Sequence, residues 1–353
     1  MTTRRGFLVA ALSSAIAPRL GWAAAGAPAV LAAGRDASGA YRLHGLSAAG
    51  ESLFSLPLPG RGHAAAAHPR KPLAVAFARR PGSFALVIDC LTGEVVQRLD
   101  APAGRHFYGH GAFTADGATL LTPENDYEAG EGRIGIWQDG KRVDELPSGG
   151  VGPHEILRLP SGGFAVANGG IMTHPDSGRA KLNIPFMEPN LAWLSPGGGI
   201  TGALALAEEM RLSSIRHLSV RGDGLVAFAM QRQDERRDAP LLGLVPAGES
   251  EARLCAAPGA EHLAMQGYGG SVAFSGDGTR VAVTSPRGGR MHVFAAADGA
   301  FQEAVLDPDV CGVAPGRGPG FMTSSGAGRI AFPGGTGAAR GHALAWDNHL
   351  AVV

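Results

Sequence analysis

Between residues 110 and 121 the sequence reads His-Gly-Ala-Phe-Thr-Ala-Asp-Gly-Ala-Thr-Leu-Leu. An apolar segment leads into the Asp-Gly dipeptide and a second apolar segment leaves it, which is a strong signal for a β-hairpin. Related hairpins start at His154 and at His217, and a looser one starts at His63. A histidine therefore opens four of the predicted hairpins.

The hairpin recurs along the whole chain. Two further copies, at residues 270–283 and 320–332, lack the histidine. A third strand, a tight turn and a fourth strand follow in most copies, as in residues 84–96 and 291–301. The turns return about every 50 residues, and such a period with four short strands per unit is typical of a β-propeller.

The number of units predicts the number of blades. Ahead of the first full copy, three strands are expected at residues 29–35, 41–46 and 52–58. Together with six fuller units they predict an all-β, seven-bladed β-propeller whose first blade lacks its innermost strand. The C-terminal segment from His349 is a natural donor, because pairing the last strand with the first closes the ring. Alternatively, this segment is the outer strand of the seventh blade, and the sequence leaves both possibilities open.

Composition agrees with a turn-rich β fold. Glycine accounts for 54 of 353 residues, and charged residues make up only 18%. Lys+Arg equals Asp+Glu at 31 each, which argues against nucleic acid or an anionic membrane surface as the main partner. The repeats run end to end without a linker, so residues 26–353 are expected to form a single domain.

The N-terminus carries an export signal. Residues 2–8 read Thr-Thr-Arg-Arg-Gly-Phe-Leu, an apolar run follows, and residues 23–25 are alanines suited to cleavage. This predicts a twin-arginine signal peptide over residues 1–25 and a periplasmic protein. The apolar run is too short to span a bilayer comfortably, so no membrane span is expected in the mature protein. A Sec signal that happens to carry two arginines is the alternative.

Unusual polar side chains gather at two kinds of position. In a propeller, the starts of the innermost strands and the loops between second and third strands lie on one face. The predicted strand starts hold His63, His110, His154, Glu155, His217 and His349, with Tyr268 just ahead of another. The predicted loops hold Glu124, Asn125, Asp126, Asn168, His174 and Asp176. These residues are therefore expected to share one rim.

Imidazoles from adjacent blades around a narrow axis can bind a metal. The predicted metal ligands are His63, His110, His154, His217 and His349. Imidazole suits iron, copper, zinc and nickel, and added carboxylates favour iron or manganese. Because neutral imidazole is the ligand form, affinity is expected to fall as the pH drops through about 6.5. The alternative is structural: strand-start histidines can pin neighbouring blades through hydrogen bonds.

Residues 168–190 interrupt the repeat with an insertion longer than most propeller loops. Loops of this length are usually functional or disordered. Arg179 within it is a candidate for contact with an anionic ligand, or else it pairs with Asp176.

At these motifs the chain resembles the family named domain of unknown function 1513. The matching segments are Gly109–Phe113, Glu124–Asp126, Gly152–Glu155, Asn168–Asp176 and Trp346–His349. The resemblance covers the whole chain and implies a twin-arginine-exported propeller without an established activity. It also implies a periplasmic iron connection, with iron-handling or redox proteins as partners.

Three functions follow as hypotheses. The leading one is a periplasmic binding or accessory propeller whose histidine-rich face holds a metal or metal complex, with iron as the first candidate. The second is a hydrolase or lactonase that uses His154 and Glu155 as acid and base with a metal-activated water. The third is a protein-docking scaffold without a ligand.

Overall fold

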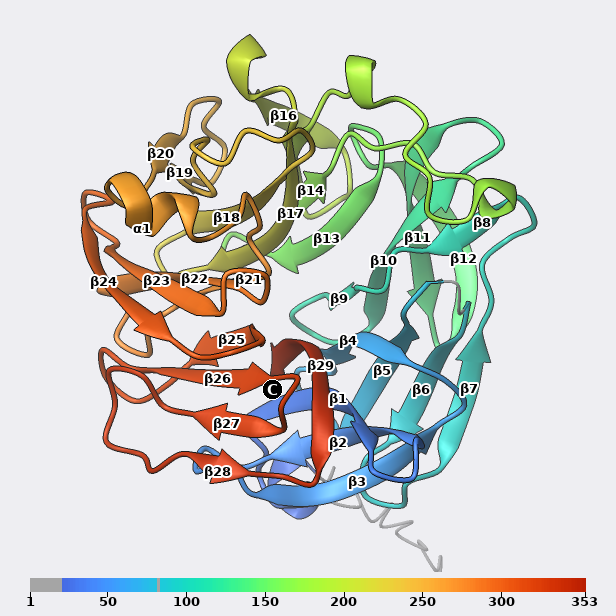
Figure 1. Ribbon diagram of the computed structural model, residues 1–353. Helices are drawn as coiled ribbons and strands as arrows, with labels where there is room; N and C mark the ends of the chain where they lie inside the picture. Colours follow the sequence, from blue (N-terminus) through green and yellow to red (C-terminus); the bar gives the residue numbers. More distant parts are fainter. Residues whose placement is uncertain (1–20, 81–82) are drawn as a thin grey trace, which may run out of the picture.

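The structure is a computed structural model that describes residues 21–80 and 83–353. Its strands form seven sheets arranged as blades around a central axis (Figure 1). The predicted all-β, seven-bladed β-propeller is therefore confirmed. The helical segments among the described residues are short: η1 (Trp22–Ala25), η2 (Pro175–Ser177), η3 (Ile184–Phe186), η4 (Glu208–Met210) and α1 (Gly259–Leu263). Most of the predicted signal peptide lies outside the described residues.

Each blade is an antiparallel sheet that is named here from the axis outward. Blade 1 comprises β29 (Leu344–Val352), β1 (Val30–Asp36), β2 (Tyr41–Leu46) and β3 (Ser52–Leu58). Blade 2 comprises β4 (Gly62–Ala67), β5 (Leu73–Ala78), β6 (Ala85–Asp89) and β7 (Val95–Leu99). Blade 3 comprises β8 (Arg105–Phe107) and β9 (Ala112–Phe113), then β10 (Thr119–Asp126), β11 (Glu131–Gln138) and β12 (Lys141–Pro147).

The remaining blades follow the regular order. Blade 4 comprises β13 (Pro153–Arg158), β14 (Phe164–Asn168), β15 (Asn190–Leu194) and β16 (Ile200–Ala205). Blade 5 comprises β17 (Ser213–Val220), β18 (Leu225–Arg232), β19 (Leu242–Pro246) and β20 (Arg253–Cys255). Blade 6 comprises β21 (Ser271–Phe274), β22 (Arg280–Ser285), β23 (Arg290–Ala295) and β24 (Phe301–Leu306). Blade 7 comprises β25 (Val310–Pro315), β26 (Phe321–Ser325), β27 (Arg329–Ala331) and β28 (Arg340–Gly341).

The C-terminal strand closes the ring. β29 pairs with β1 as the innermost strand of blade 1, so the first of the two possibilities left open by the sequence is the observed one. Asp347 in β29 accepts hydrogen bonds from Arg61 at 2.6 Å and from Arg79 at 3.0 Å. Because these arginines flank β4 and β5, the carboxylate of Asp347 ties the closing strand to blade 2.

Neighbouring blades pack face to face through alternating apolar side chains. Between blades 2 and 3, for example, Phe77 of β5 lies with its ring centroid 6.0 Å from that of Phe107. Strand residues alternate between the two faces of a sheet, so each inner blade face contributes to one interblade core. Outer strands are more exposed, as Val95 and Val96 of β7 show.

The last blade corrects one prediction. The hairpin expected at residues 320–332 as the first pair of a blade is the second pair, β26 and β27. The innermost strand is β25, whose glycine-rich connection to β26 lacks an Asp-Gly signal. The turn after Ser325 carries the stronger hairpin signal, and this displaced the predicted register of the blade.

A second correction concerns residues 124–126, which were expected in a loop. They belong to β10, where Glu124 pairs with Phe107 of β8 and with Arg133 of β11. Their backbone groups are therefore used in the sheet, although the side chains are polar.

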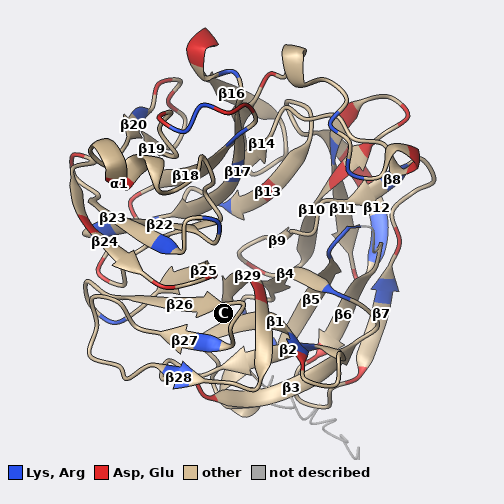
Figure 2. Cartoon of the chain, in the orientation of Figure 1, with Lys and Arg blue, Asp and Glu red and all other residues tan. Residues whose placement is uncertain are grey.

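Charged residues are distributed over several blades and loops, and both signs are interspersed (Figure 2). Within residues 21–80 and 83–353 no helix is long and apolar enough to cross a membrane.

Candidate metal centre

Five buried histidines meet at the axis of the propeller. They come from blades 1 to 5 and are His349, His63, His110, His154 and His217. We call these residues the histidine cluster. The structure thus brings together all five side chains that the sequence predicted as metal ligands.

Four of these rings form a closed circuit. The ring centroids lie 5.8 Å apart for His63 and His154, 4.7 Å for His154 and His217, 4.5 Å for His217 and His349, and 4.7 Å for His349 and His63. The ring of His110 lies 4.9 to 5.8 Å from each of the other four.

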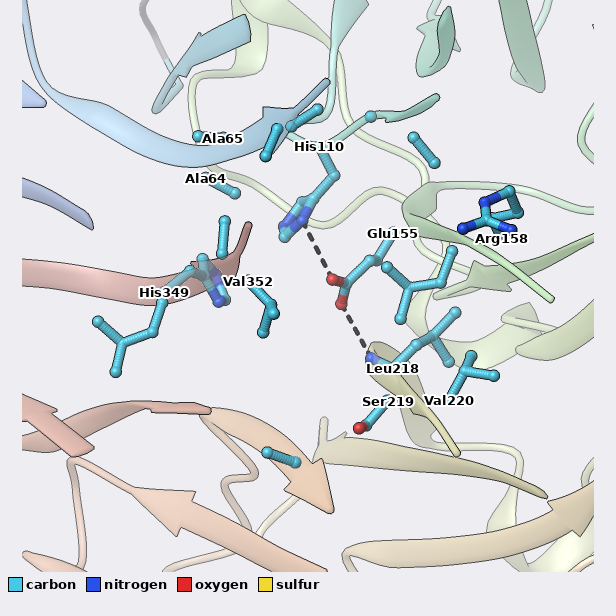
Figure 3. Close-up of a pocket in the computed structure, with 18 of the residues that line it drawn as sticks. Ala64, Ala65, His110, Glu155, Arg158, Leu218, Ser219, Val220, His349 and Val352 are labelled. Carbon is cyan, nitrogen blue, oxygen red and sulfur yellow. Dashed lines mark hydrogen bonds and ion pairs between the residues drawn. The ribbon is translucent and has the colours of Figure 1, made fainter. Parts of the chain in front are cut away.

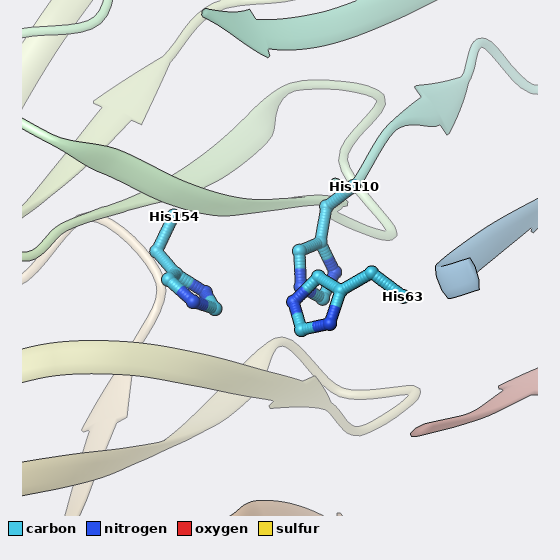
Figure 4. A group of neighbouring side chains, drawn as sticks. All are labelled: His63, His110 and His154. Atoms are coloured by element: carbon cyan, nitrogen blue, oxygen red, sulfur yellow. The ribbon is translucent and has the colours of Figure 1, made fainter. Parts of the chain in front are cut away.

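Two sets of three histidines are close enough to share an ion. In each set, ring nitrogens lie within 4.8 Å of one another; the sets are His63, His110 and His154, and His110, His217 and His349. Figure 4 shows the first set, with three rings from three different blades turned toward one another. His110 belongs to both sets and is the central member of the cluster.

Local irregularities in the inner strands place these side chains. The pairing register shifts at His63 in β4, at His154 in β13 and along residues 347–349 of β29. In β17 the shift falls at Arg216, directly before His217. A β-bulge bends the strand and redirects a side chain, so the repeated bulge accounts for the repeated inward histidine.

His110 lies in a break of the inner strand between β8 and β9, both of which pair with β10. Gly109 has a φ of 96° there, a conformation that favours glycine. A Cβ at this position would lie 2.5 Å from Cδ2 of His63. The glycine therefore permits the close approach of two cluster histidines.

Each histidine of the cluster has a ring nitrogen that makes no hydrogen bond within the described residues. The atoms are Nδ1 of His63, His154 and His217, and Nε2 of His110 and His349. Buried polar atoms without partners are uncommon because each costs desolvation energy. Five converging imidazoles with free nitrogens are the donor set that iron, copper, zinc or nickel would satisfy.

A buried carboxylate orients two of the rings. The Oε1 and Oε2 atoms of Glu155 lie 3.4 Å from Nδ1 of His110 and 3.4 Å from Nδ1 of His217, respectively. Glu155 also accepts a hydrogen bond of 2.9 Å from the backbone N–H of Leu218 (Figure 3). A proton on Nδ1 of His110 would leave its Nε2 free as a ligand, which is the usual role of a carboxylate behind a metal-binding histidine.

Electrostatics favour the ligand form of these side chains. Burial lowers the pKa of His217 to about 4 and the pKa values of His63, His154 and His349 well below the ordinary value. Burial opposes ionisation of Glu155, but its contacts with His110 and His217 hold its pKa below the usual range. The expected loss of metal affinity near pH 6.5 is therefore revised to lower pH, since protons compete only weakly for these rings.

The histidine cluster separates two cavities along the axis. On one side, a cavity of about 420 Å³ is lined by small and apolar residues of the inner strands, together with His110, Glu155 and His349. On the other side, a small polar cavity is lined by His63, His154 and His217 and by several arginines. His154 and Glu155 are thus neighbours in β13 that line opposite cavities, so the structure does not bring them together as an acid–base pair.

Three predicted residues of β10 contact other groups. Glu124 is buried beside Arg142 and accepts a hydrogen bond of 3.1 Å from Thr122, and burial raises its pKa. Asn125 donates to the carbonyl of Thr173 at 3.0 Å. Asp126 forms an ion pair of 3.2 Å with Arg105. Each of these side chains is therefore engaged in contacts outside the histidine cluster.

The insertion contributes one residue to the axis. Asn168 donates hydrogen bonds of 2.9 Å to the carbonyl of Ser148 and to Asn190, so it fastens the backbone of blade 4. His174 lies at the surface beside Asp176, whose side chain is 90% exposed. Arg179 donates to the carbonyl of Arg80 at 2.8 Å instead of pairing with Asp176, and it lines the polar cavity.

Tyr268 lies where the sequence predicted it, on the wall of the polar cavity. Sequence reasoning missed four other residues of this wall: Arg79, Arg80, Tyr108 and Arg216. They occupy the same two kinds of position as the histidines, because Arg79 and Arg80 follow a second strand and Arg216 directly precedes His217. The rule that selected the histidines would have selected these arginines as well.

The three cysteines make no disulfide with one another. Cys90, Cys255 and Cys311 are free and buried. Burial raises the pKa of Cys311 to about 12, so its thiol stays protonated.

Comparison with known proteins identifies a family and a fold. A family model described as "Protein of unknown function (DUF1513)" matches residues 56–353. A comparison with curated proteins gives no match. Among solved structures the chain is similar to hydrazine synthase of Kuenenia stuttgartiensis, with a TM-score of 0.57 and 11% identity over 81% of this chain and 86% of that chain. At this identity the similarity shows the fold alone.

Proposed function

Because the chain belongs to the family of proteins of unknown function DUF1513, we propose a function from the site itself: the protein binds a transition-metal ion at the histidine cluster. The observation that carries this proposal is the set of five buried histidines with unpaired ring nitrogens, in two sets whose nitrogens lie within 4.8 Å. A purely structural role would pair these nitrogens across blades.

His110, His154 and His63 form one candidate ligand set, and His110, His217 and His349 form the other. Glu155 would hold the rings of His110 and His217 from behind. The metal, once bound, would supply Lewis-acid or redox chemistry. The all-imidazole set suits iron, copper, zinc and nickel, and iron is our first candidate because of the sequence resemblance described above.

The proposal includes a location and a role. We place the protein in the periplasm as a binding or accessory protein for iron handling or redox partners. The support is the Arg4-Arg5 motif and the apolar run behind it, which lie in the N-terminal segment outside the described residues.

The test is metal analysis of untagged protein that has been exported natively and recovered from the periplasm. We expect the metal-stripped protein to take up Fe(II), Co(II) or Zn(II), measured by calorimetry and by elemental analysis. Replacing His110, His154 and His217 together with Asn should abolish uptake. Replacing His292 with Asn is the matched control, since this buried histidine of blade 6 is no member of the cluster.

Near-ultraviolet circular dichroism will show whether the triple variant keeps its tertiary structure. The single variant His154→Asn, which removes one ligand, should weaken binding with less risk to the fold. Full uptake by a folded triple variant, or no uptake by the wild type under reducing or oxidising conditions, would reject the proposal.

A further inference from the structure

A cavity rich in arginine lies directly against the histidine cluster. Five residues define it here as the arginine vestibule: Arg79, Arg80, Arg179, Arg216 and Arg287. It consists of two adjoining cavities of about 70 and 340 Å³. Arg79 and Arg179 line both cavities, so they form one space. His63, His154 and His217 form its floor.

Most of the positive charge in the arginine vestibule is uncompensated. Arg79 is paired with Asp347 at 3.0 Å. Within the described part of the chain, the other four arginines make no ion pair. Asp309, at the outer cavity, is the acidic residue of the wall. Uncompensated charge of one sign in a cleft focuses the electrostatic field on a ligand of the opposite sign.

The contacts of these arginines leave donors available. Arg80 donates to the hydroxyl of Thr173 at 2.8 Å, and Arg179 donates to the carbonyl of Arg80. The guanidinium of Arg287 lies 4.4 Å from the ring centroid of Tyr268. Nε of Arg216 is buried and has no hydrogen-bond partner within the described residues.

We propose that the arginine vestibule binds a small oxyanion whose far end meets the histidine cluster. Guanidinium groups recognise the paired oxygens of carboxylates and phosphates through parallel hydrogen bonds. The anion site stands on the arginines alone. The further consequence, that the protein takes its metal as a complex with this oxyanion, rests on the proposed metal function.

The shared chemistry has two sources, a polycarboxylate or a phosphate, and titration of the metal-free protein distinguishes them. Oxalate, citrate, inorganic phosphate and chloride are titrated separately by calorimetry. We expect at least one oxyanion to bind, chloride to compete weakly, and the affinity to fall as salt is raised.

Matched variants locate the site. Replacing Arg216 with Gln removes a charged donor, and we expect binding to weaken about tenfold or more. The double variant Arg80→Gln with Arg216→Gln should bind no oxyanion measurably. Arg98→Gln is the control because this arginine of β7 pairs with exposed Asp100 at the surface, and it should leave the affinity unchanged.

The result that overturns the inference is wild-type protein that binds none of the three oxyanions, or a folded double variant that binds them unchanged. The variant His110→Asn with His349→Asn separates this outcome from failure of the metal function. These two histidines line the cavity on the opposite side of the cluster, so their loss should abolish metal uptake and spare oxyanion binding. Metal uptake without oxyanion binding rejects this inference only, and oxyanion binding without metal uptake rejects the proposed function only.

Discussion

The histidines of the cluster are held neutral by their surroundings, and this ties stability to pH. Burial lowers the folded-state pKa of His217 to about 4, and those of His63, His154 and His349 still further, whereas an unfolded histidine titrates near 6.5. Between these values the unfolded chain binds more protons than the folded protein. By linkage, the free energy of unfolding then falls as the pH falls.

We therefore expect the metal-free protein to lose stability steeply once the pH drops below about 6.5. The slope approaches about 1.4 kcal/mol per pH unit for each such group. Urea unfolding between pH 7.5 and 4.5 measures it. Replacing His349 with Asn should reduce the slope by about one proton, and a pH-independent unfolding midpoint over this range would contradict the assignment.

His292 of blade 6 gives the matching control. Burial also lowers its pKa to about 4, so His292→Asn should flatten the pH dependence in the same way. It should leave metal uptake unchanged, because it lies outside the histidine cluster.

At the scale of elements, the inner strands hold the site through their irregularities. The interrupted inner strand of blade 3 is the sharpest case, since the break between β8 and β9 brings His110 next to His63. We expect Gly109→Ala to disturb this approach, because the added methyl group would meet the ring of His63 at 2.5 Å and the backbone φ is 96°.

The expected result of Gly109→Ala is weaker metal binding and a lower unfolding temperature. Calorimetric titration and thermal unfolding measure the two effects. Gly222→Ala is the control, because a Cβ there would meet no heavy atom within 4 Å and its φ is unrestricted. Unchanged metal affinity in Gly109→Ala would show that His63 and His110 do not act together.

Elements also show what the sequence could and could not predict. Asp-Gly turns and alternating apolar residues are local signals, so they identified the blades and their number. The inward histidines followed from their place at strand starts. Bulges, the use of Asn168 to fasten the backbone, and the pairing of Glu124 with Arg142 depend on neighbours far along the chain, and no local pattern reveals them.

At the scale of the whole molecule, β29 completes blade 1 and supplies one histidine of the cluster. Removing residues 344–353 would leave β1 with an unpaired edge and take Trp346 and Leu350 out of a buried core. We expect this truncated chain to aggregate and to lose cooperative thermal unfolding, because an open edge is a template for association. Val352→Thr, at an exposed position of the same strand, should change stability by less than about 0.5 kcal/mol. Cooperative unfolding of the truncated chain near the wild-type temperature would contradict this role of β29.

The position of β29 also sets an order of events during synthesis. The ribosome makes β1 early and β29 last, so blade 1 waits for its inner partner until nearly the whole chain has been translated. His349 lies in those final nine-residue strand positions, and the fifth imidazole therefore arrives together with the closing strand. A prematurely terminated chain would lack both the closed ring and the complete donor set, so only a finished molecule can become a loaded one.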